Sequence, residues 1–376
     1  MPKILIYCPN ISGHRLEYLH HMYSKAINTP ENEYYIIVDS AFKNISTIFS
    51  WPVSSNVSIE FIPESQKRNS HNILTLSFSR CKGLKKYVDK ISPEIIYVMD
   101  MIEYIPALPI IFNKKVKVRG IIYRIYLYDW KYESLFKRLL DVVKYFILSR
   151  FPQYETVYIL NDSSSTSFFN RKYRTSKFKY LPDPVAFKRI ESQTDVYFKY
   201  KIPKERMIVL HLGSMQPYKG TLNILRAIEQ LDELTLSRYT FVFAGKVNKS
   251  IKSEFYKCVV NFKSKAHIIV DDDFISFEKM SDFIESCEFI LIPYNIKSQS
   301  SGIIGHANLY EKPVVAVDHS LIGKLVKRNR MGYLLDSPSI EDIISFLKDY
   351  KSENYELGKS YIDKNTIESF VNHLEI

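Results

Sequence analysis

The stretch that decides the fold is His211-Leu-Gly-Ser-Met-Gln-Pro-Tyr-Lys-Gly220, in which a short apolar run leads into a turn rich in glycine and polar residues. Two later turns, Gly245 after an apolar run and Ser298-Gln-Ser-Ser-Gly302, repeat this arrangement. Such turns let backbone N–H groups approach an anionic ligand, and a following helix adds the positive end of its dipole. Their order and spacing predict a nucleotide-diphosphate pocket on a parallel sheet, and hence an enzyme that uses a sugar nucleotide.

Outward from this stretch, short apolar runs without alternation recur along the chain, which is typical of buried parallel strands. The predicted strands are residues 3–8, 34–38, 95–98, 120–126, 158–160, 207–212, 239–244, 267–270, 289–293 and 313–317. Helical stretches separate them, so the sequence predicts βαβ units and an α/β fold of two doubly wound halves with a cleft between them.

The segment Leu181-Pro-Asp-Pro184 interrupts this pattern, because two prolines around an aspartate prevent a helix from continuing. We therefore place the linker between two domains there, which suits a chain of 376 residues. The predicted domains are residues 1–182 and residues 183–360. Residues 361–376 form a C-terminal helix that is a candidate for crossing back to the first domain.

The formal net charge of +11 has three interpretations. A nucleic-acid binder would show a recognisable module with a basic face, and none is present, so we expect no nucleic-acid partner. The remaining two interpretations of the charge are a membrane-surface enzyme that contacts anionic lipid and a lysine-rich surface without a partner. The four cysteines are scattered, which predicts buried thiols in a reducing compartment and no metal site. We find no signal peptide and no membrane-spanning run, and expect a cytoplasmic protein, with peripheral contact to the inner face of the membrane as an option.

Residues 130–151 contain an apolar pattern at helical spacing with basic residues interleaved. The apolar positions are Leu135, Leu139, Leu140, Val143, Phe146 and Ile147. The first interpretation is an amphipathic helix whose apolar face packs on the first sheet, and the second is a basic face that contacts a membrane.

At Gly213, Lys219-Gly220, Gly245, the Ser300-Ser301-Gly302 turn and Pro313, the chain resembles the GT-B glycosyltransferases, and specifically the large retaining family of bacterial polysaccharide transferases, the group 1 type. The resemblance is strong over residues 207–336 and weaker before them. It implies two Rossmann-like domains facing across a cleft, with a nucleotide sugar held mainly by the second. No cofactor beyond this donor substrate, and no metal, is implied.

The resemblance assigns donor-binding roles to a set of residues. Lys219 meets the diphosphate, which is physically sensible because a lysine at a turn before a helix places a compact positive charge at phosphate oxygens. Phe274 and Ile275 lie near the base. The complete predicted donor set is Gly13, Gly213, Ser214, Lys219, Gly245, Phe274, Ile275, Ser298, Gln299, Ser300, Ser301, Gly302 and His306.

The chain departs from the family at its glutamate signature. The family carries two glutamates at fixed distances before the proline that corresponds to Pro313, and this chain has Ser298 and His306 at those two positions. The family also often has an arginine after the glycine of the diphosphate loop, where this chain has Ser214. His306 can still hydrogen-bond a hydroxyl through either ring nitrogen. Retaining transfer in this fold depends largely on positioning and phosphate electrostatics, so donor binding remains the expectation.

Three residues are candidates for catalysis. His14 follows a glycine in the loop after the first strand, where it contacts either the donor phosphate or the acceptor hydroxyl, or else lies on the surface or caps a helix. Tyr128 and Asp129 fall where the family often has a His-Asp pair beside the transferred sugar. Asp129 either orients or deprotonates an acceptor hydroxyl, or caps the following helix. Asp271, Asp272 and Asp273 are consecutive and point to opposite faces of an extended segment, so a shared metal is not expected.

The sequence therefore predicts a hexosyltransferase-like enzyme of surface polysaccharide synthesis. It moves a sugar from a nucleotide-diphosphate sugar to a hydroxyl of a glycan, with a lipid-linked acceptor and retention as the finer expectations. The alternative is a non-catalytic GT-B scaffold or a partner subunit of a glycosyltransferase, which the missing glutamates favour. A sugar-nucleotide 2-epimerase shares the architecture but would carry a more acidic set of residues near the cleft.

Overall fold

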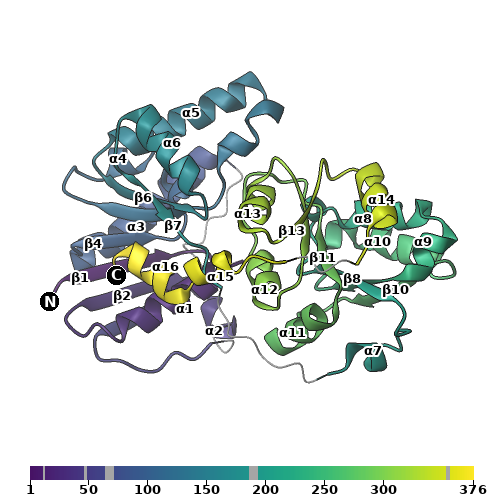
Figure 1. The fold of residues 1–376 in the computed structure, drawn as a ribbon. Coiled ribbons are helices and arrows are strands. Elements are labelled where there is room, and N and C mark those ends of the chain that lie inside the picture. The colour runs from purple at the N-terminus through teal and green to yellow at the C-terminus, as the bar shows by residue number, and fades with distance from the viewer. Residues whose placement is uncertain (12, 46–48, 64–71, 186–193, 353–355) are drawn as a thin grey trace. The chain divides into compact units, whose positions relative to one another are not determined.

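The computed structural model describes residues 1–11, 13–45, 49–63, 72–185, 194–352 and 356–376, and Ser12 of the first predicted loop lies outside them. The chain separates into two compact units. The first consists of Met1–Asp183 with Ile367–Ile376, and the second of Pro184–Thr366 (Figure 1). The sequence places the domain boundary between residues 182 and 183, next to this division.

The first unit contains a parallel sheet covered by helices. Its elements are β1 (Lys3–Cys8), α1 (Arg15–Ala26), β2 (Glu33–Asp39), α2 (Phe42–Ile45), β3 (Val57–Ile62), α3 (Ile73–Ile91), β4 (Ile95–Val98), η3 (Met101–Tyr104), α4 (Leu108–Ile111), β5 (Val118–Ile122), η4 (Tyr126–Tyr128), η5 (Trp130–Tyr132), α5 (Leu135–Arg150), β6 (Tyr154–Leu160), α6 (Ser163–Tyr173), β7 (Phe178–Leu181) and α16 (Ile367–Leu374). The seven strands lie in the order β3-β2-β1-β4-β5-β6-β7. Because β1 lies between β2 and β4, the chain changes direction across the sheet at the β1–β4 pair.

The second unit repeats this architecture. Its elements are α7 (Val196–Lys199), β8 (Met207–Leu212), η6 (Pro217–Lys219), α8 (Thr221–Gln230), α9 (Glu233–Arg238), β9 (Tyr239–Ala244), α10 (Lys249–Phe262), β10 (His267–Asp271), α11 (Phe277–Ser286), β11 (Phe289–Ile292), α12 (Ile303–Leu309), β12 (Val314–Val317), α13 (Leu321–Asn329), β13 (Gly332–Leu335), α14 (Ile340–Asp349) and α15 (Ser360–Lys364). Six parallel strands lie in the order β10-β9-β8-β11-β12-β13. The predicted α/β class with two doubly wound sheets is thus confirmed.

The final segment of the chain belongs to the first unit. Helix α16 packs against α1 and β7, as Figure 1 shows by its yellow ribbon beside the purple α1. Phe370 is fully buried against Tyr18, with ring centroids 4.9 Å apart. The hydroxyls of Tyr97 and Tyr158 donate to the carbonyl of Leu374 over 2.6 and 3.0 Å, which satisfies the end of the helix. This last turn therefore completes the core of the first unit.

Three strands of the first sheet differ from the prediction. The run at residues 120–126 forms a strand only as far as Ile122, where its pairing with β6 ends, and the chain then turns into η4. Strands β3 and β7 are missing from the predicted set. Both are edge strands, and β3 is mostly half-buried, so neither shows the unbroken apolar run of a central strand.

Helix α5 contradicts the prediction that its apolar face packs on the sheet. The helix contacts α6 and β6 through Tyr145 and Leu148, which are buried. The predicted core positions Leu135 and Leu139 are instead 80% and 61% exposed. The predicted helix is present and its apolar residues share one face, but that face points away from the sheet. No helix in the described parts of the chain has the length and apolarity to cross a bilayer.

Candidate donor site at the carboxyl end of the second sheet

The candidate site lies where the second sheet changes direction. Strand β8 has β9 on one side and β11 on the other, so the loops that follow β8 and β11 diverge from a common edge. Ligands of open α/β sheets bind in this kind of crevice, beyond the carboxyl ends of the strands. The two most informative stretches of the sequence, residues 213–220 and 298–302, are these two loops.

Three glycines allow the loops to approach one another closely. Gly213, Gly220 and Gly245 have φ angles of +92°, +73° and +135°, a region that residues with a Cβ rarely adopt. A Cβ on Gly245 would lie 2.3 Å from the carbonyl oxygen of Gly213, and one on Gly220 would lie 2.2 Å from that of Pro293. Positions 220 and 245 thus require glycine for two independent reasons, which are the backbone conformation and the lack of space for a Cβ.

Backbone hydrogen bonds fix the same loops. The N–H of Asn295 donates to the carbonyl of Tyr218 over 2.8 Å, which joins the loop after β11 to the loop after β8. The N–H of Gly213 donates to Ala244 over 2.8 Å. Ser214, exposed at the position where the family often has arginine, accepts a bond of 2.8 Å from the Gln216 side chain. Hydrogen bonds within and between the loops therefore hold this edge together.

Lys219 brings a positive charge to this edge. Its Nζ lies 3.2 Å from where a Cβ of Gly213 would be, and 5.4 Å from the ring centroid of Tyr294. Ile303, the first residue of α12, is also next to Gly213. Among the ion pairs of the described residues, none includes Lys219. An ammonium group that no carboxylate neutralises, at a turn with close backbone approach, is suited to phosphate oxygens.

Two further residues at this edge were not singled out by the sequence reasoning as site residues. Tyr294 is 3% exposed, and its hydroxyl is buried without a hydrogen-bond partner. His211 is 2% exposed and bonds through Nδ1 to Leu291 and through Nε2 to Thr221, each over 2.9 Å. Burial, together with the charge of Lys219, lowers the pKa of His211 to about 4, although the hydrogen bond to the Leu291 carbonyl opposes this. The available signal was a polar side chain near the carboxyl end of each of two adjacent strands, since His211 is the penultimate residue of β8 and Tyr294 follows β11 by two positions.

The serine-rich turn leads directly into α12. Ser298 and Ser301 are buried, whereas Gln299, Ser300 and Gly302 are half-buried. The N–H of Ile304 donates to Ser301 over 3.2 Å, and the N–H of Leu321 donates to Lys297 over 2.8 Å. The turn thus lies between α12 and the start of α13, on the same edge as Lys219.

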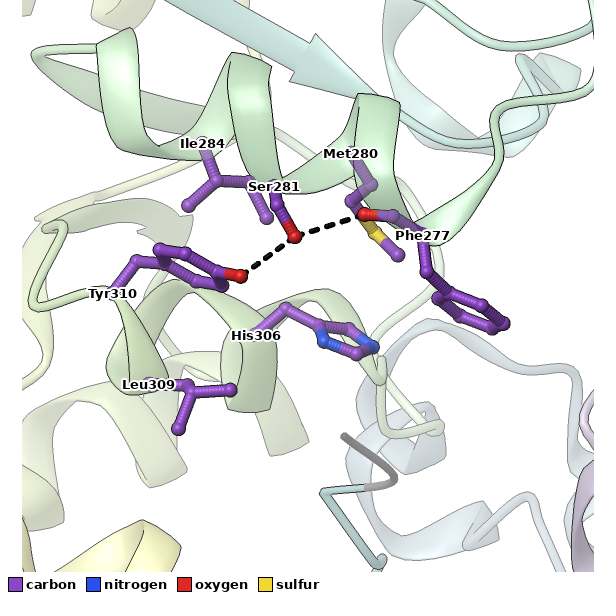
Figure 2. A pocket seen from close by; sticks show the side chains of 7 residues that line it. All are labelled: Phe277, Met280, Ser281, Ile284, His306, Leu309 and Tyr310. Carbon is purple, nitrogen blue, oxygen red and sulfur yellow. Dashed lines mark hydrogen bonds between the residues drawn. The ribbon is translucent and has the colours of Figure 1, made fainter. Parts of the chain in front are cut away.

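His306 lies on α12, away from the glycine turns, and lines a small pocket between α11 and α12. Figure 2 shows its ring pointing toward the first turn of α11, where Phe277 lies, with ring centroids 6.5 Å apart. The Tyr310 hydroxyl donates to Ser281 over 2.6 Å, and Ser281 donates to the Phe277 carbonyl over 2.9 Å. The pocket is lined by Phe277, Met280, Ser281, Ile284, His306, Leu309 and Tyr310.

The segment after β10 carries the predicted base contacts. Phe274 is 68% exposed and Ile275 is half-buried. The neighbouring aspartates point to different partners: Asp271 pairs with Lys279 over 2.5 Å, and Asp272 pairs with Lys252 over 2.7 Å and accepts from the N–H of Val247. No group of His, Cys, Asp or Glu with the arrangement of a metal site occurs in the described ranges.

The first unit places its candidates at the edge of its own sheet. Gly13 has a φ of +65°, and a Cβ there would meet nothing within 4 Å. His14 begins α1, and its side chain caps no backbone group; its ring instead lies 3.5 Å from Glu17 and stacks on Tyr18. Although burial raises it, the neighbouring imidazoles of His14 and His21 bring the pKa of Glu17 down to about 2.

An ion-pair network that the sequence reasoning did not identify lies at the β1–β4 pair. Arg15 pairs with Asp100 over 2.8 Å and with Glu103 over 3.7 Å, and Arg80 pairs with Glu103 over 2.7 Å. The Arg15 guanidinium also lies 5.5 Å from the ring centroid of Tyr123. Burial raises the pKa of Asp100 to about 6, although the charge of Arg15 opposes this.

Tyr128 and Asp129 are neighbours in sequence with separate roles in the structure. The Tyr128 hydroxyl donates to Asp162 over 2.6 Å, and Asp162 is also the N-cap of α6. Burial and the Asp162 charge raise the pKa of Tyr128, so the hydroxyl keeps its proton. Asp129 precedes η5, and its side chain makes no capping bond to that helix. The capping interpretation of Asp129 is thus not what the structure has.

Within the second unit, the structure brings together Gly213, Lys219 and Gly245 with the start of α12. His306 and Phe274 lie on other elements of that unit. Gly13, His14, Tyr128 and Asp129 belong to the first unit and lie on loops after β1 and β5.

Residues 192–366 match the family model described as glycosyl transferases group 1. The described part of this match lies within the second unit. No curated protein matches the chain in sequence.

Solved structures match the whole chain in fold. HepE of Anabaena, in complex with UDP and glucose, has a TM-score of 0.70 at 15% identity and covers 100% of this chain and 98% of its own. Sucrose-phosphate synthase from Thermosynechococcus elongatus has a TM-score of 0.69 at 14% identity, with coverages of 100% and 98%. WaaG, a glycosyltransferase involved in lipopolysaccharide biosynthesis, has a TM-score of 0.64 at 13% identity, with the same coverages. At these identities, the likeness establishes the fold.

Proposed function

We propose that this chain, which has the GT-B fold and matches the glycosyl transferases group 1 model over residues 192–366, is a glycosyltransferase that moves a sugar from a nucleoside diphosphate sugar to a hydroxyl of a lipid-linked glycan during surface polysaccharide synthesis. The observation that carries the proposal is the position of Lys219, an ammonium group with no ion-pair partner among the described residues, beside Gly213 at the start of α12. The proposed partners are therefore a nucleotide sugar, a glycan or lipid-linked acceptor, and the inner face of the membrane.

The proposed chemistry follows from charge. Cleaving the bond between the sugar and the diphosphate leaves negative charge on the phosphate oxygens, and Lys219 stabilises that charge as it develops. Backbone N–H groups of the turn at Ser300, Ser301 and Gly302 contribute to the same task. Because the leaving group is stabilised in place, the acceptor can attack from the face that the diphosphate leaves, which is transfer with retention.

The predicted catalytic residues enter this proposal with different roles. Tyr128 keeps its proton because its hydroxyl is committed to Asp162, so it is a hydrogen-bond donor and no base. The His14 side chain is 53% exposed and lies beside Glu17, and Asp129 makes no capping bond to η5. We propose His14 and Asp129 as the groups that contact the acceptor hydroxyl or the transferred sugar. Phe274 and Ile275 are proposed to contact the base, and Ser298, Gln299 and His306 the sugar hydroxyls.

A second candidate function is a non-catalytic scaffold that binds a partner transferase or a glycan. The residues Ser298 and His306 favour this candidate, because the family that the chain resembles carries glutamates at these two positions and this chain has no carboxylate there. A scaffold has no requirement for Lys219, and this separates the two candidates.

The testing experiment is thermal stabilisation of the protein by UDP, GDP, CMP and their sugar conjugates, followed by calorimetric titration with the best of them. We expect one nucleotide family to stabilise the protein, and Lys219→Ala to weaken its binding about 30- to 100-fold, as expected for a charge-assisted bond to phosphate. The matched control is Lys257→Ala on the exposed side of α10, which should bind as the wild type does. Stabilisation by no nucleotide, or equal binding by Lys219→Ala, would support the scaffold.

A further inference from the structure

The outward face of α5 carries a continuous apolar surface, which we call the α5 stripe. It consists of Tyr132, Leu135, Phe136, Leu139, Leu140, Val143, Phe146 and Phe151, each at least 40% exposed. Within α5, the spacing from residue 135 to residue 146 is that of one helix face, and Tyr132 and Phe151 lie just beyond the two ends of the helix. Of the 18 large apolar residues that are exposed in the described parts of the chain, these eight fall within 20 consecutive positions. A cluster of this kind marks an interaction surface, whereas scattered exposed residues need no explanation.

The stripe is not needed to hold α5 in place. The opposite face of the helix packs on the first unit through Tyr145, whose ring centroid lies 4.3 Å from that of Phe169 on α6, and through Leu148, which is fully buried. Figure 1 shows α5 lying over α6. Ser134 caps the start of the helix by accepting from the N–H of Lys137. The inward contacts of α5 are thus made by residues that are not part of the stripe.

Basic groups surround the stripe. Five lysines and arginines lie within residues 130–151, against Glu133 and Asp141, and these two acids already pair with Lys137 and Lys144. Arg150 lies 5.5 Å from the ring centroid of Phe146. At the end of the helix, Lys177 donates to the Phe151 carbonyl over 2.6 Å and Lys117 to the Pro152 carbonyl over 3.0 Å. The apolar stripe thus has a cationic rim at its carboxyl end and along its flanks.

We propose that the α5 stripe docks this protein on an anionic phospholipid surface, with α5 lying in the plane of the interface. Apolar side chains in a row enter the boundary between headgroups and acyl chains, and lysine and arginine at the rim contact the lipid phosphates. Trp130 and Tyr132, at the start of the stripe, are side-chain types that suit this boundary. This inference rests on the membrane partner proposed above and deepens it by naming the surface that makes the contact, and its evidence is the exposure and charge of α5 and not the donor site.

The charge of the rim is the reason for choosing a lipid surface over a second copy of the chain. A two-fold contact of α5 with itself would place the cationic rim against an identical cationic rim, which is unfavourable. An anionic bilayer satisfies the apolar stripe and the rim together. Binding should therefore require both anionic lipid and low salt for full strength.

The experiment is flotation of the whole protein with vesicles of phosphatidylcholine alone or mixed with phosphatidylglycerol, at low and high salt. We expect the protein to float with the mixed vesicles at low salt. The double variant Leu135→Ser, Leu139→Ser should lose about tenfold or more in partitioning, because two exposed side chains no longer enter the bilayer. Lys131→Glu, Arg150→Glu should remove the preference for anionic lipid.

The matched control is Leu234→Ser, Val260→Ser, which replaces two residues of the second unit that are 79% and 70% exposed. It should partition as the wild type does. No flotation of the wild type, equal flotation of the stripe variant, or a dimer in sedimentation that the stripe variant disrupts would each overturn the proposal. Nucleotide stabilisation of the same variants is measured in parallel and should be unchanged, so that failure of the docking surface and failure of the donor site are told apart.

Discussion

The carboxyl-end edges of the two sheets are built on similar parallel strands but handle charge in opposite ways. At the edge of the second sheet, Lys219 lies beside Gly213 and takes part in none of the ion pairs found among the described residues. At the edge of the first sheet, Arg15 is held by Asp100 and Glu103. A cation without a carboxylate suits an anionic diphosphate, whereas a neutralised network suits an uncharged ligand such as a sugar hydroxyl. The same architecture is thus specialised by its loop side chains.

The two edges differ also in their backbones. Gly245 and Gly213 are in such close approach that a Cβ has no room, while a Cβ on Gly13 in the first unit would meet nothing within 4 Å. Gly13 and Gly245 both have a positive φ. This contrast separates the effect of backbone conformation from the effect of space, and it gives the largest of the expected effects.

Gly245→Ala is expected to destabilise the second unit by about 3–5 kcal/mol and to abolish nucleotide binding, because strain at positive φ is added to a clash with the Gly213 carbonyl. Gly13→Ala carries only the conformational part and is expected to cost about 1 kcal/mol. Native-state hydrogen exchange measures the free energy of unfolding of each unit separately. Equal losses in the two variants would show that space at the second edge is not what Gly245 provides.

His211 is expected to make the second unit less stable in acid. Burial lowers its pKa to about 4 from an ordinary 6.5. Between these values the unfolded chain binds a proton that the folded chain does not, so stability falls as pH falls from about 6.5 to about 4, by about 3 kcal/mol. His211→Gln should flatten this part of the hydrogen-exchange profile. His319→Gln, at a side chain that is 79% exposed, should leave it as it is in the wild type.

Asp100 is expected to act on the first unit with the opposite sign. Burial raises its pKa to about 6 from an ordinary 3.8. As pH rises from about 4 to about 6, the unfolded chain releases this proton before the folded chain does, so stability falls over that window, by about 2 kcal/mol. Urea unfolding followed by the fluorescence of Trp51 and Trp130, both in the first unit, measures this slope.

The conservative variant Asp100→Asn should remove the slope between about pH 4 and pH 6. Asp89→Asn, at an exposed pair with Lys85, should keep it. A slope that persists in Asp100→Asn would assign the titration to another group of the Arg15 network, with Glu103 as the next to test.

Apolar runs in the sequence predicted five of the six strands of the second unit, all but β13, and the turns that follow them. Apolar runs such as residues 239–244 are long enough, and buried on both faces, to leave an unambiguous pattern. Gly213 and Gly245 could be identified because a glycine directly after such a run, in a chain with 11 glycines, indicates a backbone that other residues cannot adopt. Local pattern and final structure agree there because both follow from the same short-range sterics.

Only the tertiary structure decided which contacts form between distant residues. The partners of Tyr128 and Arg15 are 34 and 85 residues away, and no spacing rule connects them. Helix α5 is the clearest case: the period of Leu135, Leu139 and Val143 defines one apolar face, but the side chains that the sheet offers decide whether that face is buried. Tyr145 and Leu148 are the residues of α5 that pack inward, and the rings of Phe169 on α6 and Phe178 on β7 lie beside Tyr145. The apolar face of Leu135, Leu139 and Val143 therefore points outward. A helical period determines which residues share a face, and packing alone determines what the face meets.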